Sequence, residues 1–553
     1  MSTTRQFSSI SRSYPLVGPI PRPTDRNEQR EALGAGLFTF ILSLVAAAVL
    51  VFKYHTMQND ALGRVMDAYY VIYHQFHLAA IGFVWNPLPS LLELPLVAFE
   101  RWWHPLVTDA FAGSIVSSLF AGLGAYYLTR IMQHWHISRW FRGLWALIYV
   151  LNPMIFLFEP NGMSDIMMVT TFLAALDGLL RYIATENIGQ LVSSSIWLGL
   201  AFLNRYEAVP FALCIGVAWD IGMIVHGVPW KKIIGRTAIL ALPITYLGLL
   251  WIFFNWTIMG DPFYFANSEY SNAAQMKTGI YNFWVTALAK HSIPGTAHVL
   301  IFFANLFPPF IPAFILVVVV ALVKKLDTEA LILLAASVAV PLLQADLLFK
   351  GLSAAWDRYF IMYIPMGFLL IFYLVNVLRG RRWKTWVLSG LATIALLVGD
   401  AQTLSAIQKP GTGHGLRPLV AYLLHPNRPN SGALARATVI DTGNTEMAKE
   451  EADYINRHPH IRVLLDTFNF FFVIPYVDRP SQVVITNDTD FRSVLQNPRG
   501  RITDILVPQP VGISQLNMVN VVYPTLWSGG VPWARLVASF GSDRLYQVLS
   551  NAP

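Results

Sequence analysis

The sequence predicts a mainly α-helical protein that crosses a membrane about eleven times and ends in a small α/β domain outside the membrane. Three observations lead to this fold class. Hydrophobic residues make up 55% of the 553 residues and charged residues only 13%, which is typical of membrane proteins. Long apolar runs fill most of the chain up to residue 405. Beyond that residue, short apolar strands alternate with amphipathic helices.

Residues 1 to 33 are polar and rich in Ser, Pro and Arg, so we expect a disordered cytoplasmic tail there. The transmembrane domain is predicted over residues 34 to 405. Its apolar segments lie approximately at 34–54, 108–130, 143–158, 163–182, 190–204, 207–226, 237–258, 296–323, 328–348, 359–378 and 385–405. Basic residues gather in every second loop, and short loops with such an excess are typically cytoplasmic. An odd number of spans then places the C-terminal domain on the outer face.

A linker rich in Pro, Gly and His opens the predicted C-terminal α/β domain, residues 406 to 553. Four segments read as buried strands, "ATVIDT", "IRVLLD", "SQVVIT" and "ITDILVP", and two read as amphipathic helices, "NTEMAKEEADYINRHP" and "DTDFRSVLQNP". Their alternation predicts a largely parallel sheet. We expect the domain to lie over the outer face as an acceptor-recognition element, a lid or a purely structural cap.

The first outer loop, from about residue 55 to about residue 107, contains the stretch "NDALGRVMDAYYV". If this stretch is helical, its spacing places Asp60, Arg64 and Asp67 on one face. A solvated helix with an internal ion pair would show the same pattern. The spacing alone therefore leaves both a structural and a functional role open.

Further polar residues gather in loops with the same predicted sidedness. They are Asn161, Asp165, Asn204, Arg205, Glu207, Asp261, Asp346, Asp357 and Arg358. Ionisable residues at membrane depth are costly and usually line a cavity or pair with one another, so this convergence predicts a functional site on the outer face. For any single loop, an ordinary interfacial charge is the alternative.

These loops carry short motifs that resemble the GT-C superfamily of polytopic membrane glycosyltransferases, in particular the protein O-mannosyltransferase and aminoarabinose transferase group. The motifs are "NDALGR" or "MDAYY" after the first span, then "VWNPLPSLLELP", "LNRYEAVP", "GDPFYF" and "WDRYFIMYIP", in this order over residues 34 to 405. The resemblance implies an enzyme that transfers a hexose or pentose from a polyprenyl-phosphate donor to an acceptor on the outer face. It also implies inversion at the anomeric carbon.

The resemblance implies a role for each of these polar residues. A carboxylate must take the acceptor's proton, and Asp60 and Asp67 are the candidates. The superfamily commonly has two adjacent acidic residues, whereas alanine follows each aspartate in this chain. Arginine suits the departing phosphate because its planar fork stays charged, and the candidates are Arg64, Arg205 and Arg358. The residues expected to bind or orient the sugar or the acceptor are Asn161, Asp165, Tyr206, Glu207, Asp357 and Tyr359.

Three of these expectations are more specific. Glu207 is expected to hold Arg205, and Asp357 to hold Arg358. Asp165 either binds sugar hydroxyl groups or caps the helix that begins beside it. The alternative for Arg205 and Arg358 is that their side chains simply extend toward lipid headgroups at the membrane surface.

The sequence requires no cofactor. A divalent cation stays an option if Asp60 or Asp67 meets Asp165 in space, and His74 with His77 resembles a metal half-site only weakly. No nucleotide-binding motif is visible in the sequence. The net charge of +7 comes from basic clusters between apolar runs, which indicates membrane topology rather than nucleic-acid binding.

We therefore expect an integral, multi-pass protein of a prokaryotic plasma membrane that acts in the cell envelope. Its N-terminus would be cytoplasmic and its C-terminal domain extracytoplasmic. Its partners would be a polyprenyl-phosphate sugar, a lipid, glycan or protein acceptor, and the membrane. The main alternative is a lipid or polysaccharide transporter or flippase, which would also concentrate charge in a membrane cavity. A non-catalytic assembly factor is a third option.

Overall fold

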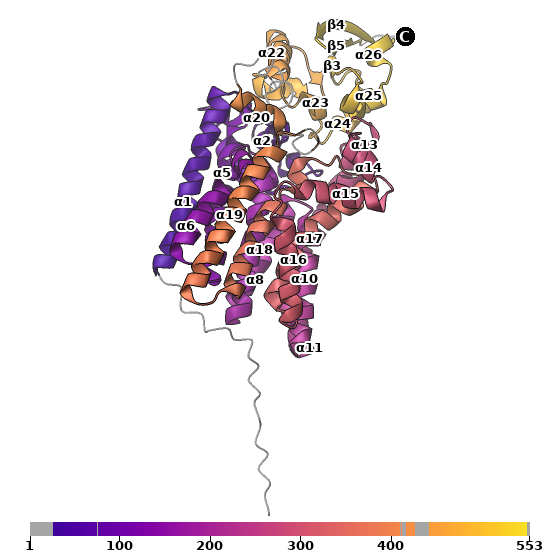
Figure 1. The fold of residues 1–553 in the computed structure, drawn as a ribbon. Helices are drawn as coiled ribbons and strands as arrows, with labels where there is room; N and C mark the ends of the chain where they lie inside the picture. Colours follow the sequence, from indigo (N-terminus) through magenta and orange to yellow (C-terminus); the bar gives the residue numbers. More distant parts are fainter. Residues whose placement is uncertain (1–25, 75, 410, 412–415, 426–441, 550–553) are drawn as a thin grey trace, which may run out of the picture.

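A computed structural model describes residues 26–74, 76–409, 411, 416–425 and 442–549. Its helices form an elongated bundle, and the C-terminal domain covers one end of that bundle (Figure 1). Helix α1 (Arg26–Ala48) already begins at Arg26, so residues 26 to 33 are helical and do not belong to an irregular tail as expected. Residues 1 to 25 of that expected tail lie outside the described residues.

Eight helices within the described residues are long and apolar enough to cross a membrane. Each of them overlaps one of the predicted apolar segments, which supports the expected class of integral membrane protein. They are α1 continued by η1 (Arg26–Lys53), α5 (Phe111–His134), α8 (Ser164–Thr185), α10 (Ala208–Val225), α11 (Trp230–Met259), α17 (Thr328–Phe349), η4 continued by α18 (Asp357–Leu378), and α19 (Arg382–Ala406).

The predicted count of about eleven spans is not confirmed, because three expected segments lack a helix of that length. The first of them divides into α6 (Arg139–Val150) and α7 (Pro153–Phe158). Asn152 lies at this break, and its side chain accepts hydrogen bonds from the backbone N–H groups of Met154 and Ile155. Asn152 therefore caps α7. Helix α7 begins with Pro153, and the first helical position is where proline is commonly found.

The other two expected segments also lack a helix of spanning length. The run at 296–323 divides into α15 (Ile293–Ala304) and α16 (Phe310–Val323), with Pro308 and Pro309 between them. Helix α9 (Ile188–Asn204) has only 17 residues. It corresponds to the expected segment at 190–204.

The two ends of the bundle carry different side chains. Near one end of α8, Asp177 pairs with Arg130 at 2.9 Å and with Arg181 at 2.7 Å. Asp165 is the second residue of the same helix, and a rise of 1.5 Å per residue separates it from Arg181 by about 24 Å. These basic residues and the predicted site thus lie toward opposite ends of the bundle, whereas the membrane side that each end faces stays a prediction.

Two long loops fold into short helices at the end that carries the C-terminal domain. The first contains α2 (Asn59–Tyr69), η2 (Tyr70–His74), η3 (Leu78–Ile81), α3 (Leu88–Val97) and α4 (Pro105–Thr108). Helix α2 has the predicted helical conformation. The second loop, between α11 and α15, contains α12 (Tyr264–Asn267), α13 (Asn272–Lys277) and α14 (Trp284–Ala289).

The C-terminal domain contains a five-stranded sheet in the order β2-β1-β3-β5-β4. Strand β1 (Val463–Leu464) pairs in parallel with β2 (Val483–Val484) and with β3 (Asp504–Val507), as three of the predicted segments require. A hairpin of β4 (Ala534–Phe540) and β5 (Asp543–Val548) adds two antiparallel pairings, so the expectation of a largely parallel sheet is wrong. The expected strand "ATVIDT" lies outside the described residues except for its last residue.

Helices and loops complete this domain and attach it to the bundle. Its helices are α20 (Arg417–Leu424), α22 (Thr442–Arg457), α23 (Thr467–Phe470), α24 (Phe491–Gln496), α25 (Met518–Val522) and α26 (Leu526–Gly529), of which α22 and α24 match the two predicted ones. His74 Nε2 lies 2.9 Å from Asp488 Oδ2, and the Asn487 side chain donates to the carbonyl of Ala80 at 2.7 Å. The turn after β2 is therefore bound directly to the segment that follows α2.

Candidate active site

Asp60 and Arg358 form the ion pair at the centre of the candidate site. Asp60 is the second residue of α2, and Arg358 is the second residue of η4, the turn that leads into α18. Oδ2 of Asp60 lies 2.8 Å from Nη1 of Arg358. The Asp60 side chain is 37% exposed and the Arg358 side chain 18%, so the carboxylate is the more accessible partner.

Arg205 follows the last residue of α9 and is held by two carboxylates. Its Nη1 donates to Asp165 at 3.0 Å, and its Nη2 donates to Glu207 at 2.7 Å. The expected contact between Glu207 and Arg205 is therefore present. Asp165 also holds this arginine, and it does not cap α8, whose N-cap position is Met163.

The ring of Tyr359 lies close to both Arg358 and Arg205. Its centroid is 5.5 Å from the guanidinium carbon of Arg358 and 6.0 Å from that of Arg205. Both distances lie within the range of cation–π attraction. Two guanidinium groups from distant parts of the chain thus share one aromatic ring, which offsets part of their mutual repulsion.

Arg64 completes the group of arginines and differs from the other two. Its guanidinium carbon lies 4.9 Å from the ring centroid of Trp85, and its side chain is buried. Among the described residues, its Nε and Nη1 have no hydrogen-bond partner. Arg64 is therefore a buried cation whose donor groups stay available to a ligand.

The arginines set the charge of the carboxylates around them. Burial alone would raise the pKa of Asp60, but the charge and hydrogen bond of Arg358, and then the charges of Arg64 and Arg205, lower it from 3.8. Burial is likewise outweighed at Glu207, where Arg205 lowers the pKa. Both carboxylates are therefore ionised at neutral pH.

Asp67 lies in a different environment from Asp60. Both residues are on the same face of α2, but seven residues separate them by about 10 Å along the helix axis. Burial raises the pKa of Asp67 well above 3.8, against the opposing effects of Arg64 and of a hydrogen bond from Asn487 in the C-terminal domain. Asp60 thus belongs to the arginine group, whereas Asp67 faces the domain boundary.

Tyr206 and Asp357 make contacts other than the expected ones. The Tyr206 hydroxyl donates to the carbonyl of Val84 at 3.1 Å and accepts from Trp251 at 3.1 Å, so it braces the first loop. Its expected role in binding or orienting the sugar or the acceptor stays a prediction. Asp357 accepts from the backbone N–H of Arg358 at 2.8 Å, whereas the guanidinium of that arginine pairs with Asp60.

Asn161 lies in the turn before α8. Its Oδ1 accepts from the backbone N–H of Met163 at 2.9 Å. Its Nδ2 is buried and has no partner within the part of the chain that the structure describes. Because this amide group is free to donate, the expected role of Asn161 in ligand binding stays a prediction.

The described residues offer no preformed set of ligands for a divalent cation. Within the described ranges, no group of three or more His, Cys, Asp or Glu residues is arranged to hold a metal ion. Asp60 and Asp165 each pair with an arginine, and His74 pairs with Asp488.

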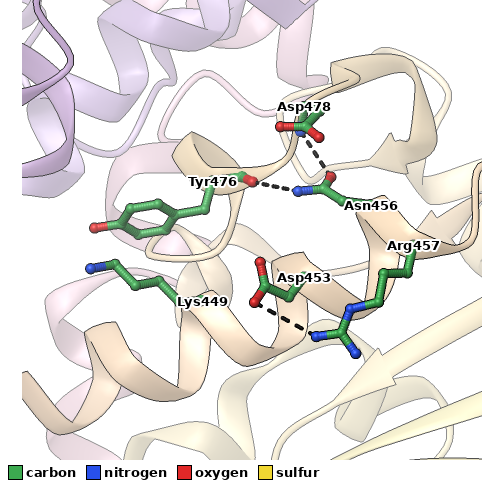
Figure 2. Close-up of a pocket in the computed structure, with 6 residues that line it drawn as sticks. All are labelled: Lys449, Asp453, Asn456, Arg457, Tyr476 and Asp478. Carbon is green, nitrogen blue, oxygen red and sulfur yellow. Dashed lines mark hydrogen bonds and ion pairs between the residues drawn. The ribbon is translucent and has the colours of Figure 1, made fainter.

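A separate open recess of about 570 Å³ lies in the C-terminal domain (Figure 2). Its lining residues are Lys449, Asp453, Asn456, Arg457, Tyr476 and Asp478. Asn456 and Asp478 are linked through the Asp478 backbone N–H at 2.9 Å, and Asp453 lies 3.7 Å from Arg457. The pair of Asp453 and Arg457 lies within one helix, and the Lys449 ammonium lies 5.2 Å from the ring centroid of Tyr476, so this recess carries charges of both signs, unlike the arginine group of the bundle.

Sequence reasoning missed Glu93, a buried residue of α3. Electrostatic interaction links it to Arg64, and its Oε2 has no partner among the residues described. The available signal was a single acidic residue inside the apolar stretch "SLLELPLV". An acidic residue inside an apolar stretch of a membrane protein is a candidate for a functional site.

No protein-family model matches this chain, and no curated protein matches it.

Proposed function

We propose that this protein is an inverting glycosyltransferase of the GT-C type that moves a sugar from a polyprenyl-phosphate donor to an acceptor at the outer face of the membrane. The observation that carries the proposal is the ion pair of Asp60 and Arg358, with Arg64 and Arg205 close enough to lower the pKa of the same carboxylate. One accessible carboxylate beside three cations is the arrangement that such a transfer needs.

The chemistry assigns opposite tasks to the two kinds of group. The acceptor oxygen attacks the anomeric carbon while its proton passes to the Asp60 carboxylate. The bond between the anomeric carbon and the phosphate oxygen breaks, and the polyprenyl phosphate leaves with the electron pair. Arg64 is the guanidinium with free donors, so it is our first choice for binding the phosphate, and Arg358 and Arg205 add positive charge near it.

The position of the group also supports the proposal over a transporter. Asp60, Asp165, Arg205 and Arg358 lie at helix beginnings or ends, close to the loops. Transporters typically bind their substrates near the midplane, in interrupted helices of two repeated halves.

Reconstituted vesicles provide the test. The full chain is incubated with polyprenyl phosphates that carry mannose, glucose or arabinose, and with water-soluble and lipid acceptors, and both transfer products and movement of the lipid across the bilayer are measured. Transfer that Asp60→Asn abolishes supports the enzyme. Movement of the lipid without any transfer by the wild type would support a flippase and refute the proposal.

The matched control is Asp346→Asn. Asp346 pairs with Lys350 at 2.7 Å, but both side chains are more than half exposed, at 52% and 56%. Because exposed ion pairs contribute little, this variant is expected to keep the activity of the wild type.

A further inference from the structure

Five polar side chains around α2 have buried hydrogen-bonding atoms without a partner among the described residues. These atoms are Arg64 Nε and Nη1, Glu93 Oε2, Asn161 Nδ2, Asp165 Oδ2 and Asn204 Oδ1. The Arg64, Glu93, Asp165 and Asn204 side chains are each at least nine-tenths buried. Buried polar atoms are nearly always paired in folded proteins, so a local concentration of unpaired ones indicates that water or a ligand supplies their partners.

Close packing brings these residues from four elements to one place. A Cβ atom on Gly113 would lie 3.2 Å from Glu93 Oε1 and 3.4 Å from Gly162 Cα, and a Cβ atom on Gly162 would lie 2.9 Å from the Cβ of Ala61 in α2. Gly162 also has a positive φ of 75°. The absence of side chains at these two glycines therefore lets Glu93 and the turn before α8 approach α2.

The remaining members join through direct contacts. The Asn204 side chain donates to the carbonyl of Ser164 at 3.1 Å, beside Asp165. Arg64 interacts electrostatically with Asp60, Glu93 and Asp165. These residues thus lie around α2, which also carries the proposed catalytic carboxylate of Asp60.

The mixture of unpaired atoms identifies the chemistry of the ligand. Asn161 offers a donor beside the free donors of Arg64 that we assign to the phosphate, whereas Asp165 and Asn204 offer acceptors. Burial, followed by the charge of Asp67, raises the pKa of Glu93 well above 4.5, which lets this carboxyl group donate as well as accept. Hydroxyl groups both donate and accept, so a sugar ring that carries several of them in a fixed arrangement matches this mixture.

We infer that Glu93, Asn161, Asp165 and Asn204 form a subsite for the hydroxyl groups of an uncharged sugar ring, next to the phosphate that we propose Arg64 binds, with Glu93 as a specificity-determining residue. This inference rests on the proposed function, because it places the ring beside Asp60. The ring belongs either to the lipid-linked donor or to a glycan acceptor, which have the same hydroxyl chemistry.

Binding measurements on the full chain in nanodiscs test the subsite. The probes are polyprenyl phosphate without a sugar, the same lipid with mannose, glucose or arabinose, and alkyl glycosides of these sugars. The key variant is Glu93→Met, and Glu451→Met serves as the control because Glu451 is a buried glutamate of α22 in the other domain. We expect Glu93→Met to weaken binding of at least one sugar-bearing probe roughly tenfold without changing the affinity for sugar-free polyprenyl phosphate.

A stability measurement separates this role from a structural one. Because Glu93→Met removes an unpaired buried polar atom, its melting temperature should equal or exceed that of the wild type. A loss confined to the lipid-linked sugars assigns the ring to the donor, and a loss confined to the alkyl glycosides assigns it to the acceptor.

The unfavourable outcomes are distinct from one another. Equal effects of Glu93→Met on sugar-bearing and sugar-free probes, or no effect on any probe, would overturn the subsite. If the wild type binds polyprenyl phosphate but gains no affinity from any sugar, the subsite is refuted while a lipid-phosphate site survives. If the wild type binds none of the probes, the proposed function is refuted together with the subsite.

Discussion

The carboxylate of Asp60 lies 2.8 Å from the guanidinium of Arg358, although the first residue follows the first span and the second precedes α18. This contact selects Asp60 over Asp67 as the proposed catalytic carboxylate. It also gives Asp60 a cation that lowers its pKa, whereas burial dominates at Asp67 and raises the pKa there. The following predictions start from this difference.

Removal of the Asp60 carboxylate should abolish most of the activity while the protein stays folded. Loss of a general base typically costs about 10²- to 10⁴-fold in rate, so Asp60→Asn is expected to lower kcat by that amount. Asp67→Asn should retain a larger share of activity. Initial rates of sugar transfer, with melting temperatures measured in parallel, check both variants, and the reverse order of effects would move the role to Asp67.

The pH dependence of kcat/KM distinguishes the two aspartates independently. The pKa of Asp60 in the folded protein lies below 3.8, so its carboxylate stays ionised and the acidic fall in kcat/KM should come below that pH. If Asp67 were the base, its raised pKa would place the fall well above pH 3.8. A profile of kcat/KM measured over the pH range in which the protein stays folded decides between them.

Arg358 should determine where the acidic fall lies. In Arg358→Gln the largest charge that opposes the effect of burial on Asp60 is lost, so the pKa of Asp60 and the acidic limb of kcat/KM should both rise. The lowered pKa of Asp60 also makes the free energy of unfolding depend on pH. Because the folded-state pKa of Asp60 is lowered, its ionisation stabilises the wild type above the unfolded pKa, and this contribution is lost as the pH falls through the folded value.

Lysine at the same position provides the contrast. Arg358→Lys keeps a positive charge but loses the planar fork, so it should shift the acidic limb less than Arg358→Gln. Equal shifts in the two variants would show that the charge of Arg358 does not control the pKa of Asp60.

Arg205 should be important for stability as well as for function. Its two partners, Asp165 and Glu207, are buried, and Arg205→Met would leave both carboxylates without their cation. Removal of one partner from a buried ion pair typically costs about 3–5 kcal/mol, so a large loss of melting temperature is expected.

The exposed ion pair of Asp346 and Lys350, at the C-terminal end of α17, serves as the comparison for Arg205. Lys350→Met removes one partner of a largely exposed ion pair and should change the free energy of unfolding by less than about 1 kcal/mol. Similar losses in Lys350→Met and Arg205→Met would show that burial does not govern the contribution of Arg205.

The contact between His74 and Asp488 should hold the C-terminal domain against the first loop. His74→Leu removes the partner of a buried aspartate, so local opening should increase at η2 and at the turn after β2. Hydrogen exchange of the backbone amides of residues 70–82 and 483–490 measures this. His104→Leu is the control, because the His104 side chain is 70% exposed, and equal exchange in the two variants would contradict the prediction.

The sequence by itself determined the features that depend on neighbouring residues. Apolar runs of sufficient length specify the eight long helices, and the spacing of Asp60, Arg64 and Asp67 predicts the shared face of α2. The alternation of strands and helices after residue 405 predicts β1, β2 and β3 with α22 and α24. Each of these signals lies within one segment and repeats with the period of its own secondary structure.

Only the tertiary structure decided which side chains meet. The pairing of Asp60 with Arg358, the separation of Asp67 toward Asn487 and the approach of Glu93 to Arg64 depend on how distant helix ends pack. The β4–β5 hairpin likewise joins the sheet through pairing with β3, which no local period specifies. Charge pairing and burial act through space, so a pattern along the chain shows which residues are able to form a site but not which partner each of them finds.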